Sequence, residues 1–119
     1  MANWTEWMNA GGDEVVTGTT FPTAHNGSVE LGFRPSKLYL FGILYGGAST
    51  NSITNSLSYV YEDEQVISNR HVYLKYNQEY PTLSSSEITV TISDTGFTYT
   101  VPTNSMFSES TPIYFVAVK

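Results

Sequence analysis

Three consecutive acidic residues, Glu62, Asp63 and Glu64, form the densest group of potentially reactive side chains in the chain. Carboxylates at such spacing can bind calcium, and two carboxylates held across a cleft can cleave a glycosidic bond. The run fits no defined calcium loop, and the sequence places no two of the 11 acidic residues across a cleft. We therefore interpret the run as the solvated tip of a hairpin.

The two histidines, His25 and His71, belong to different expected elements, and neither has a carboxylate or a second imidazole at metal-ligand spacing. The chain contains no cysteine, which excludes disulfides, thiolate metal sites and thiol nucleophiles. It also lacks the sequence motifs of serine hydrolases, phosphate-binding loops and zinc proteases. We expect a protein that is not an enzyme and has no cofactor and no metal, with both histidines at the surface or in hairpins.

Charge and the length of apolar segments argue against two classes of partner, nucleic acids and membranes. The net charge is −6 and the five Lys and Arg residues are scattered, unlike the basic patch of a nucleic-acid-binding protein. No segment approaches the ~18 consecutive apolar residues of a membrane-spanning helix. The first residues have neither a basic region nor an apolar run, so we expect no signal peptide, no membrane contact and no nucleic acid.

Alternating apolar and polar residues predict β-strands over most of the chain. Residues 87–101 should form a hairpin, because Ile88, Val90 and Ile92 share one face of a strand that is followed by the turn sequence "DTG". We expect Gly96 to adopt a left-handed conformation in that turn. The same alternation predicts strands at 13–21, 27–33, 37–46, 56–62, 65–69, 71–77 and 113–119.

About eight to ten closely spaced strands are typical of an all-β fold, and we predict an antiparallel, jelly-roll-like β-sandwich over residues 13–119. Residues 1–12 precede it as an N-terminal arm or short helix. Segments rich in Ser, Thr and Asn predict loops at 46–56, 81–87 and 103–112.

The strand that begins after the corner at Pro35 is apolar on both faces. We expect it in the middle of a sheet, with Leu38, Leu40 and Leu44 facing the core. The last strand repeats the pattern, so both strands leave large apolar side chains on the opposite face. A closed barrel would bury that face; otherwise a lid or another subunit must cover it. We favour a subunit and predict an oligomer interface formed by Tyr39, Phe41, Ile43, Tyr45, Tyr114 and Val116.

The N-terminal arm carries its own apolar group. Trp4, Trp7 and Met8 are spaced at i, i+3 and i+4, as on one face of a short helix. They could anchor the chain to a partner protein, or they could cover the core of their own domain. The sequence leaves both alternatives open.

Three segments together resemble small β-sandwich modules of tailed-bacteriophage structural proteins, of the tail-fibre-tip or virion-appendage type. They are "VELGFRPSKLYLFG" at 29–42, "DTGFTYTV" at 94–101 and "IYFVAVK" at 113–119, and the resemblance extends from about residue 17 to residue 119. It implies a component of a virus particle, made in the host cytoplasm and commonly trimeric, that decorates the shell or contacts the host surface. The N-terminal arm would then dock onto other virion proteins.

Two functions follow as expectations. The first is a non-enzymatic virion structural protein, as a capsid decoration, head fibre or tail appendage, that assembles as a symmetric homo-oligomer with a trimer favoured. The alternative is a carbohydrate-binding module for host recognition, in which the predicted loops present Asn51, Asn55 and Asn104 to a host surface glycan.

Overall fold

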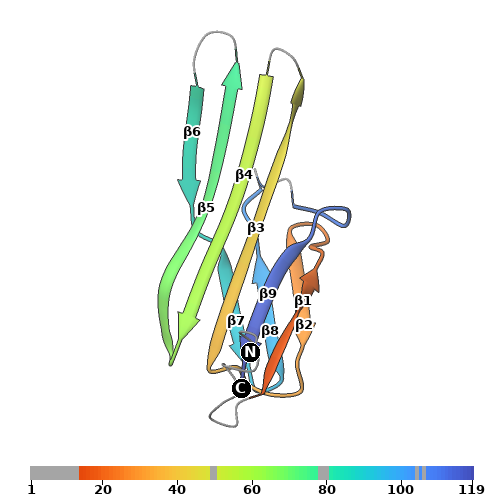
Figure 1. The fold of residues 1–119 in the computed structure, drawn as a ribbon, viewed down its shortest axis with the longest axis vertical. Coiled ribbons are helices and arrows are strands. Elements are labelled where there is room, and N and C mark those ends of the chain that lie inside the picture. The colour runs from red at the N-terminus through yellow and green to blue at the C-terminus, as the bar shows by residue number, and fades with distance from the viewer. Residues whose placement is uncertain (1–13, 49–50, 78–80, 104, 106) are drawn as a thin grey trace, which may run out of the picture.

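The computed structural model describes residues 14–119 except 49–50, 78–80, 104 and 106, and it consists of two antiparallel sheets (Figure 1). The predicted N-terminal arm lies outside the described residues. Within the described part of the chain there is no helix, and hence none that could cross a membrane.

The two sheets differ in size. The small sheet has the order β2-β8-β7 and the large sheet the order β1-β9-β3-β4-β5-β6. In the small sheet the strands are β2 (Asn26–Glu30), β7 (Thr89–Ser93) and β8 (Gly96–Thr100). In the large sheet they are β1 (Val15–Thr20), β3 (Lys37–Ala48), β4 (Asn51–Glu62), β5 (Gln65–Asn77), β6 (Pro81–Ser86) and β9 (Ile113–Val118).

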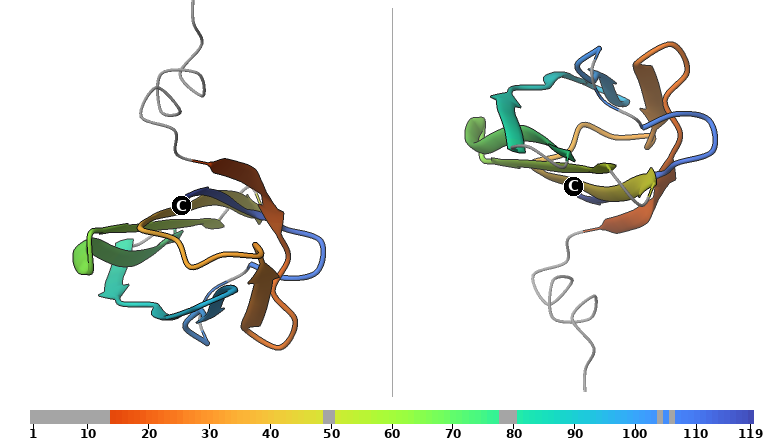
Figure 2. Two further views of the ribbon diagram at one scale, coloured as in Figure 1. Left: turned by 90° about the horizontal axis from the view of Figure 1, so that it is seen from below. Right: turned by 90° about the horizontal axis from the view of Figure 1, so that it is seen from above.

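These nine strands confirm the predicted antiparallel β-sandwich. The first and last described strands, β1 and β9, pair in the large sheet, while β2 and β8 pair in the small sheet. This nested pairing resembles that of a jelly roll. The sheets lie as two layers when the molecule is viewed end-on (Figure 2), so the alternative of a closed barrel is wrong.

The core lies between the layers and is formed by alternate residues of each strand. Phe97 of β8 meets Phe115 of β9 edge to face, with ring centroids 5.6 Å apart. Tyr99 reaches from the small sheet to the large one, where its hydroxyl bonds that of Thr20 at 2.9 Å. The buried side chains of β3, β4 and β9 that complete the core are Leu38, Leu40, Leu57, Tyr59, Tyr61, Ile113, Phe115 and Ala117.

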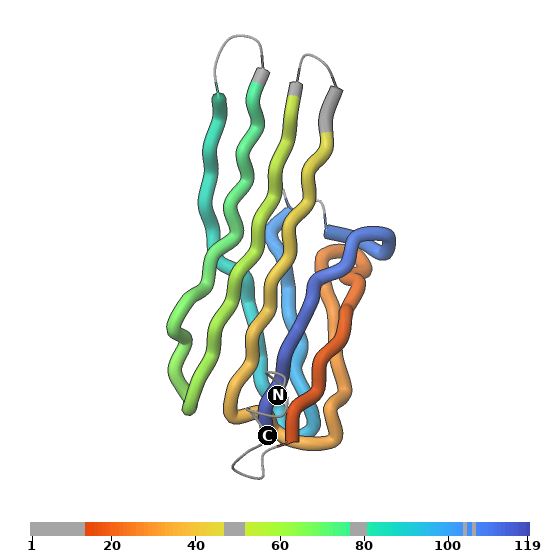
Figure 3. The backbone as a smooth tube through the Cα atoms, in the orientation of Figure 1, coloured from red at the N-terminus to blue at the C-terminus, as the bar shows by residue number. Residues whose placement is uncertain are grey.

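Strands β3 to β6 extend well beyond the small sheet (Figures 1 and 3). Twelve residue pairs join β3 to β4, whereas β9 pairs with β3 only from Lys37 to Phe41. We call the protruding part, described at 42–48, 51–56, 71–77 and 81–86, the four-stranded extension. Its outer face continues the outer face of the large sheet.

The extension corrects three predictions. The segments 46–56 and 81–87, expected to be loops, contribute to strands β3, β4 and β6, and the two strands expected at 65–69 and 71–77 are one continuous strand, β5. Ser, Asn and Gly have low intrinsic strand propensity. Pairing within the hairpins β3–β4 and β5–β6 overrides that propensity here, as in the pairs Gly46–Ile53 and Lys75–Thr82.

Hydrogen bonds fix the points where the chain crosses between sheets. At the predicted corner, the amide of Ser36 donates to the carbonyl of Val118 at 2.7 Å and brings the chain into β3. Between β6 and β7, the side-chain amide of Asn69 donates to the carbonyl of Ile88 and its oxygen accepts from the amide of Ile88, both at 2.8 Å. Asn69 thereby holds the start of the small sheet against β5.

The turn between β7 and β8 is present as predicted. The prediction that Gly96 adopts a left-handed conformation is wrong, because among the described glycines only Gly32 has a positive φ, of 80°. Gly96 pairs with Glu30 of β2, and an added Cβ would overlap the carbonyl oxygen of Val29. Glycine is therefore required for a close approach of two backbones and not for a turn conformation.

Gly96→Ala should lower the free energy of unfolding by about 3 kcal/mol, because the new methyl group must displace the backbone of β2. Gly46→Ala is the matched control, since a Cβ there meets nothing within 4 Å, and it should change stability by less than about 1 kcal/mol. Urea denaturation of both variants measures the difference. Equal free energies of unfolding for the two variants would contradict the close approach of Gly96 to the backbone of Val29.

Candidate functional site

The outer face of the large sheet carries most of the exposed large apolar side chains that the structure describes. The strand register places these side chains on the face opposite the core. Ile43 is 75% exposed and Tyr45 is 72% exposed, values unusual for such residues in a strand. The seven such side chains on this face are Phe41, Ile43, Tyr45, Leu74, Tyr76, Leu83 and Tyr114.

These side chains form two ridges with a furrow between them. Phe41, Ile43 and Tyr45 form the ridge on β3, and the Phe41 ring stacks on Tyr114 of β9 at 5.7 Å. In register with them on β4 are only small hydroxyl residues. Beyond Thr54 and Ser56 the apolar residues resume on β5, whereas beyond Ser58 lies the exposed Arg70. The furrow consists of Ser52, Thr54, Ser56 and Ser58, and the second ridge of Val72, Leu74, Tyr76 and Leu83.

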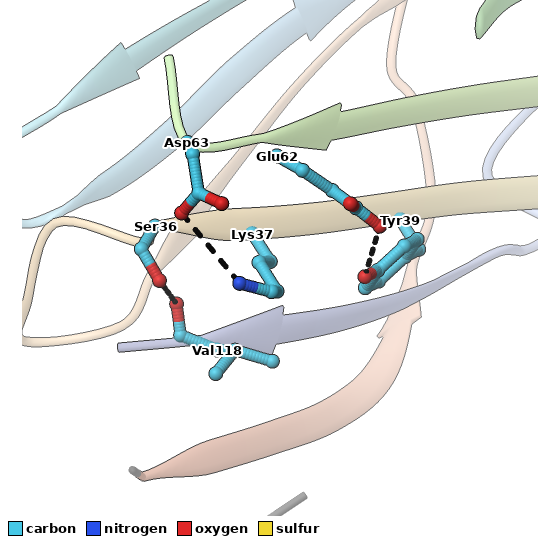
Figure 4. Close-up of polar contacts among 6 residues, drawn as sticks. All are labelled: Ser36, Lys37, Tyr39, Glu62, Asp63 and Val118. Carbon is cyan, nitrogen blue, oxygen red and sulfur yellow. Dashed lines mark hydrogen bonds and ion pairs between the residues drawn. The ribbon is translucent and has the colours of Figure 1, made fainter. Parts of the chain in front are cut away.

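The end of the outer face farthest from the extension is polar (Figure 4). Lys37 pairs with Asp63 at 3.6 Å, and the Tyr39 hydroxyl donates to Glu62 at 2.7 Å. Burial of the phenol and this hydrogen bond raise the pKa of Tyr39 to about 12. By contrast, the residues described on the outer face of the extension include no charged side chain.

All six residues predicted for an oligomer interface lie on this outer face. Tyr39 and Val116 are half-buried, whereas the other four are exposed. The sequence prediction missed the ridge on β5 and β6, formed by Val72, Leu74, Tyr76 and Leu83. The alternation in "HVYLKYN" is a signal for it, but only the strand order shows that this ridge shares a face with the ridge on β3.

Of the three residues predicted to touch a glycan, the structure describes the side chain of Asn55 alone. Asn55 is fully buried on the inner face, so its role as a surface contact is wrong. Asn51 belongs to β4, and its side chain lies outside the described part of the structure, as does Asn104. The predicted anchors Trp4, Trp7 and Met8 lie in residues 1–13, also outside the described part.

Asn55 instead bonds His71, which is also fully buried; of the two placements that we predicted, surface or hairpin, His71 has the second, in the hairpin of β5 and β6. Their side chains lie 2.8 Å apart, from Nε2 of His71 to Oδ1 of Asn55. Because an amide oxygen only accepts, Nε2 carries the proton. The other ring nitrogen, Nδ1, has no hydrogen-bond partner among the described residues. Burial lowers the pKa of His71, because the imidazolium would lose its hydration.

Two clefts lie away from the outer face of the large sheet. The larger, about 540 Å³, lies on the small sheet and is lined mainly by threonines, with Phe21 at one side. The second, about 480 Å³, contains His25 and Glu109 beside Ser108 and Ser110, whose hydroxyls bond each other at 3.2 Å. In the described part of the chain no group of three His, Asp or Glu could hold a metal ion.

No protein-family model, curated protein or solved structure matches this chain. What the protein does is therefore inferred from its own surfaces. The outer face of the large sheet differs most from an ordinary protein surface, because its exposed side chains are large, apolar and adjacent.

The stability of the fold should decrease as pH falls below about 6.5. The unfolded chain takes up a proton at His71 near pH 6.5, whereas the folded chain resists protonation, so acid favours unfolding. The slope should reach up to about 1.4 kcal/mol per pH unit. Urea denaturation between pH 5 and pH 8 measures it.

The double variant Asn55→Leu with His71→Leu removes both buried polar partners and should lose this slope, while His25→Gln should retain it. A slope that persists in the double variant would assign the acid sensitivity to other groups.

Proposed function

We propose that the protein is a non-enzymatic structural module that functions as a symmetric homo-oligomer, whose copies contact one another through the outer face of the large sheet. The observation that carries this proposal is the set of exposed apolar side chains on that face, which includes Ile43 and Tyr45. No second layer of described residues covers them. A further copy of the chain brings the same apolar surface and can bury it.

The exposed apolar area approaches what a stable interface requires. At roughly 150 to 250 Å² for a fully exposed aromatic side chain, the seven partly exposed residues present on the order of 600 Å² of apolar surface. The largest apolar patch of a typical monomer covers about 300 to 600 Å². A stable interface buries about 800 Å² on each partner, so this face supplies most of what one copy needs.

The distribution of charge supports the same proposal. Interfaces are depleted of charged residues at their centre and are polar at the rim. Lys37, Glu62 and Asp63 lie at one end of the outer face, Arg70 lies in register with Ser58 just before the extension, and the described outward residues of the extension itself are uncharged. The extension would therefore form the centre of the interface. The turn between β4 and β5, which includes Asp63, would form part of its rim.

The resemblance to tailed-bacteriophage modules extends the proposal to a virion protein that serves as a capsid decoration, head fibre or tail appendage. In that setting Trp4, Trp7 and Met8 would dock onto other virion proteins. Cryo-electron microscopy of assembled particles tests this part of the proposal, and a protein found only outside particles would contradict it.

A second candidate function is carbohydrate binding, favoured by the threonine-lined cleft on the small sheet. Thr89, Thr91, Thr98 and Thr100 present hydroxyls in a cleft whose side wall includes Phe21, which is 48% exposed. Hydroxyls can bond the hydroxyls of a neutral sugar, and an aromatic ring can pack on its apolar face.

Ile43→Glu should convert the oligomer into monomers, because it places a charge at the centre of the apolar face. Light scattering at micromolar concentration measures the mass, and circular dichroism checks the fold. Phe21→Glu is the matched control, since Phe21 is exposed but lies outside this face. A wild-type protein that is monomeric would overturn the proposal.

The same two variants separate the second function from the first. On a glycan array, wild type and Ile43→Glu should give equal signals if the threonine-lined cleft binds sugar, whereas Phe21→Glu should lose the signal. No signal from the wild-type protein would remove this candidate.

A further inference from the structure

One side of the distal part of β3 has no described strand beside it. β9 pairs with β3 from Lys37 to Phe41, and beyond Phe41 no described strand pairs with that side. β3 itself continues to Ala48, paired on its other side with β4. Figure 3 shows β3 extending well past the end of β9. We call this side of residues 42–48 the free edge of β3.

The register of the β3–β4 ladder identifies the backbone groups on the free edge. The amide of Asp63 donates to the carbonyl of Ser36 at 2.8 Å, in register with that ladder. In an antiparallel ladder each residue turns its N–H and its C=O to the same neighbouring strand, and successive residues alternate. Ser36 and the even-numbered residues of β3 therefore bond β4. Ile43 and Tyr45 turn their N–H and C=O groups to the free edge.

The free edge lacks the features that usually protect an edge strand. Edge strands are commonly short, or they carry a charge or a proline that prevents pairing. β6, at the other border of the four-stranded extension, begins with Pro81 and is followed by Glu87. By contrast, the sequence between Lys37 and Glu62 contains no charged residue and no proline. The free edge of β3 is therefore competent to pair with a further strand.

We propose that residues 1–7 of the same chain pair with the free edge of β3 as an extended strand. This inference goes beyond the proposed function, because it concerns a sheet edge and not the outer face. Val15, at the start of β1, pairs with Val118, and Val118 pairs in turn with Lys37. A segment that leads from the free edge to Val15 therefore runs antiparallel to β3, as do both strands that already pair with β3.

The length of the chain before β1 fits this path. Ile43 lies six residues beyond the level of Val15 and two strands across, a distance of about 22 Å at ~3.4 Å per residue and ~4.8 Å per strand. Trp7 precedes Val15 by eight residues, which span up to about 27 Å when extended. Gly11 and Gly12, which lie between them, permit the chain to bend as it crosses β9.

The side chains of residues 1–7 suit the two faces of the free edge. Trp4 and Trp7 are three positions apart, so an extended strand directs them to opposite faces. One ring would extend the ridge on β3. The other would cover the inner face, where Leu44 is half-buried and an added Cβ at Gly46 meets nothing within 4 Å. The outer face would thereby gain an aromatic ring for contact with a neighbouring copy.

Tryptophan fluorescence tests this inference, because Trp4 and Trp7 are the only two tryptophans in the chain. We expect the wild-type protein to emit at shorter wavelength than the urea-unfolded chain, independently of protein concentration. Tyr45→Pro removes an N–H from the free edge and leaves the ladder to β4 intact, so its emission should shift to that of the unfolded chain. Tyr45→Thr is the matched control, because it also loses the ring but keeps the N–H, and it should keep the wild-type emission. Circular dichroism checks the fold of both variants.

Amide hydrogen exchange of the wild-type protein, followed by NMR, is a second test that needs no variant. The amides of Ile43 and Tyr45 should exchange as slowly as that of Leu44, which bonds β4. On an edge without a partner strand they would exchange about 100-fold faster than Leu44. Such fast exchange would overturn this inference even if Tyr45→Pro failed to fold.

The remaining outcomes are distinguishable. Wild-type emission equal to that of the unfolded chain, or a folded Tyr45→Pro with wild-type emission, would overturn the pairing. Loss of the emission in Tyr45→Thr would show that the ring, and not the backbone, holds the segment. An emission that shifts on dilution together with a fall in mass would assign residues 1–7 to a neighbouring copy and overturn pairing within one chain. A monomeric wild-type protein with slow exchange at Tyr45 would overturn the proposed function and leave this inference standing.

Discussion

The long antiparallel ladder between β3 and β4 is the constraint on which the rest of the structure depends. Its twelve residue pairs exceed the reach of the small sheet, so the same two strands form half of a sandwich and half of an uncovered extension. Because side chains alternate between faces, the ladder also assigns every residue of β3 to the core or to the outer face. A register shift of one residue would turn Phe41 toward the core and Leu40 toward the outer face. Neither face would then keep its present set of side chains.

The inner face of the large sheet changes where the part covered by the small sheet ends and the extension begins. Phe107, from the segment after β8, packs against Gly42 so closely that an added Cβ would lie 2.7 Å from the ring. Beside this level, Asn55 and His71 use the inner positions of β4 and β5 and are fully buried. Their mutual hydrogen bond replaces apolar packing at the boundary, which makes this part of the core sensitive to protonation.

The outer face links this architecture to assembly. A sheet that exposes several adjacent large apolar side chains presents the kind of surface at which proteins associate. The row of Ser and Thr on β4 is notable because the neighbouring rows are large and apolar, although all three rows belong to one continuous ladder.

The sequence by itself determined the strand character of the chain, the hairpin of β7 and β8, the corner before β3 and the two-faced apolar pattern of β3 and β9. These features depend on alternation and on local turn chemistry, which act between near neighbours. The tertiary structure alone decided that residues 46–48, 51–56 and 81–86 are strands, because cross-strand pairing in the long hairpins overrides the low strand propensity of these Ser-, Gly- and Asn-rich segments. It also decided that Asn55 and His71 are buried together, and that the ridges of β3 and β5 share a face, because strand order depends on contacts between distant residues.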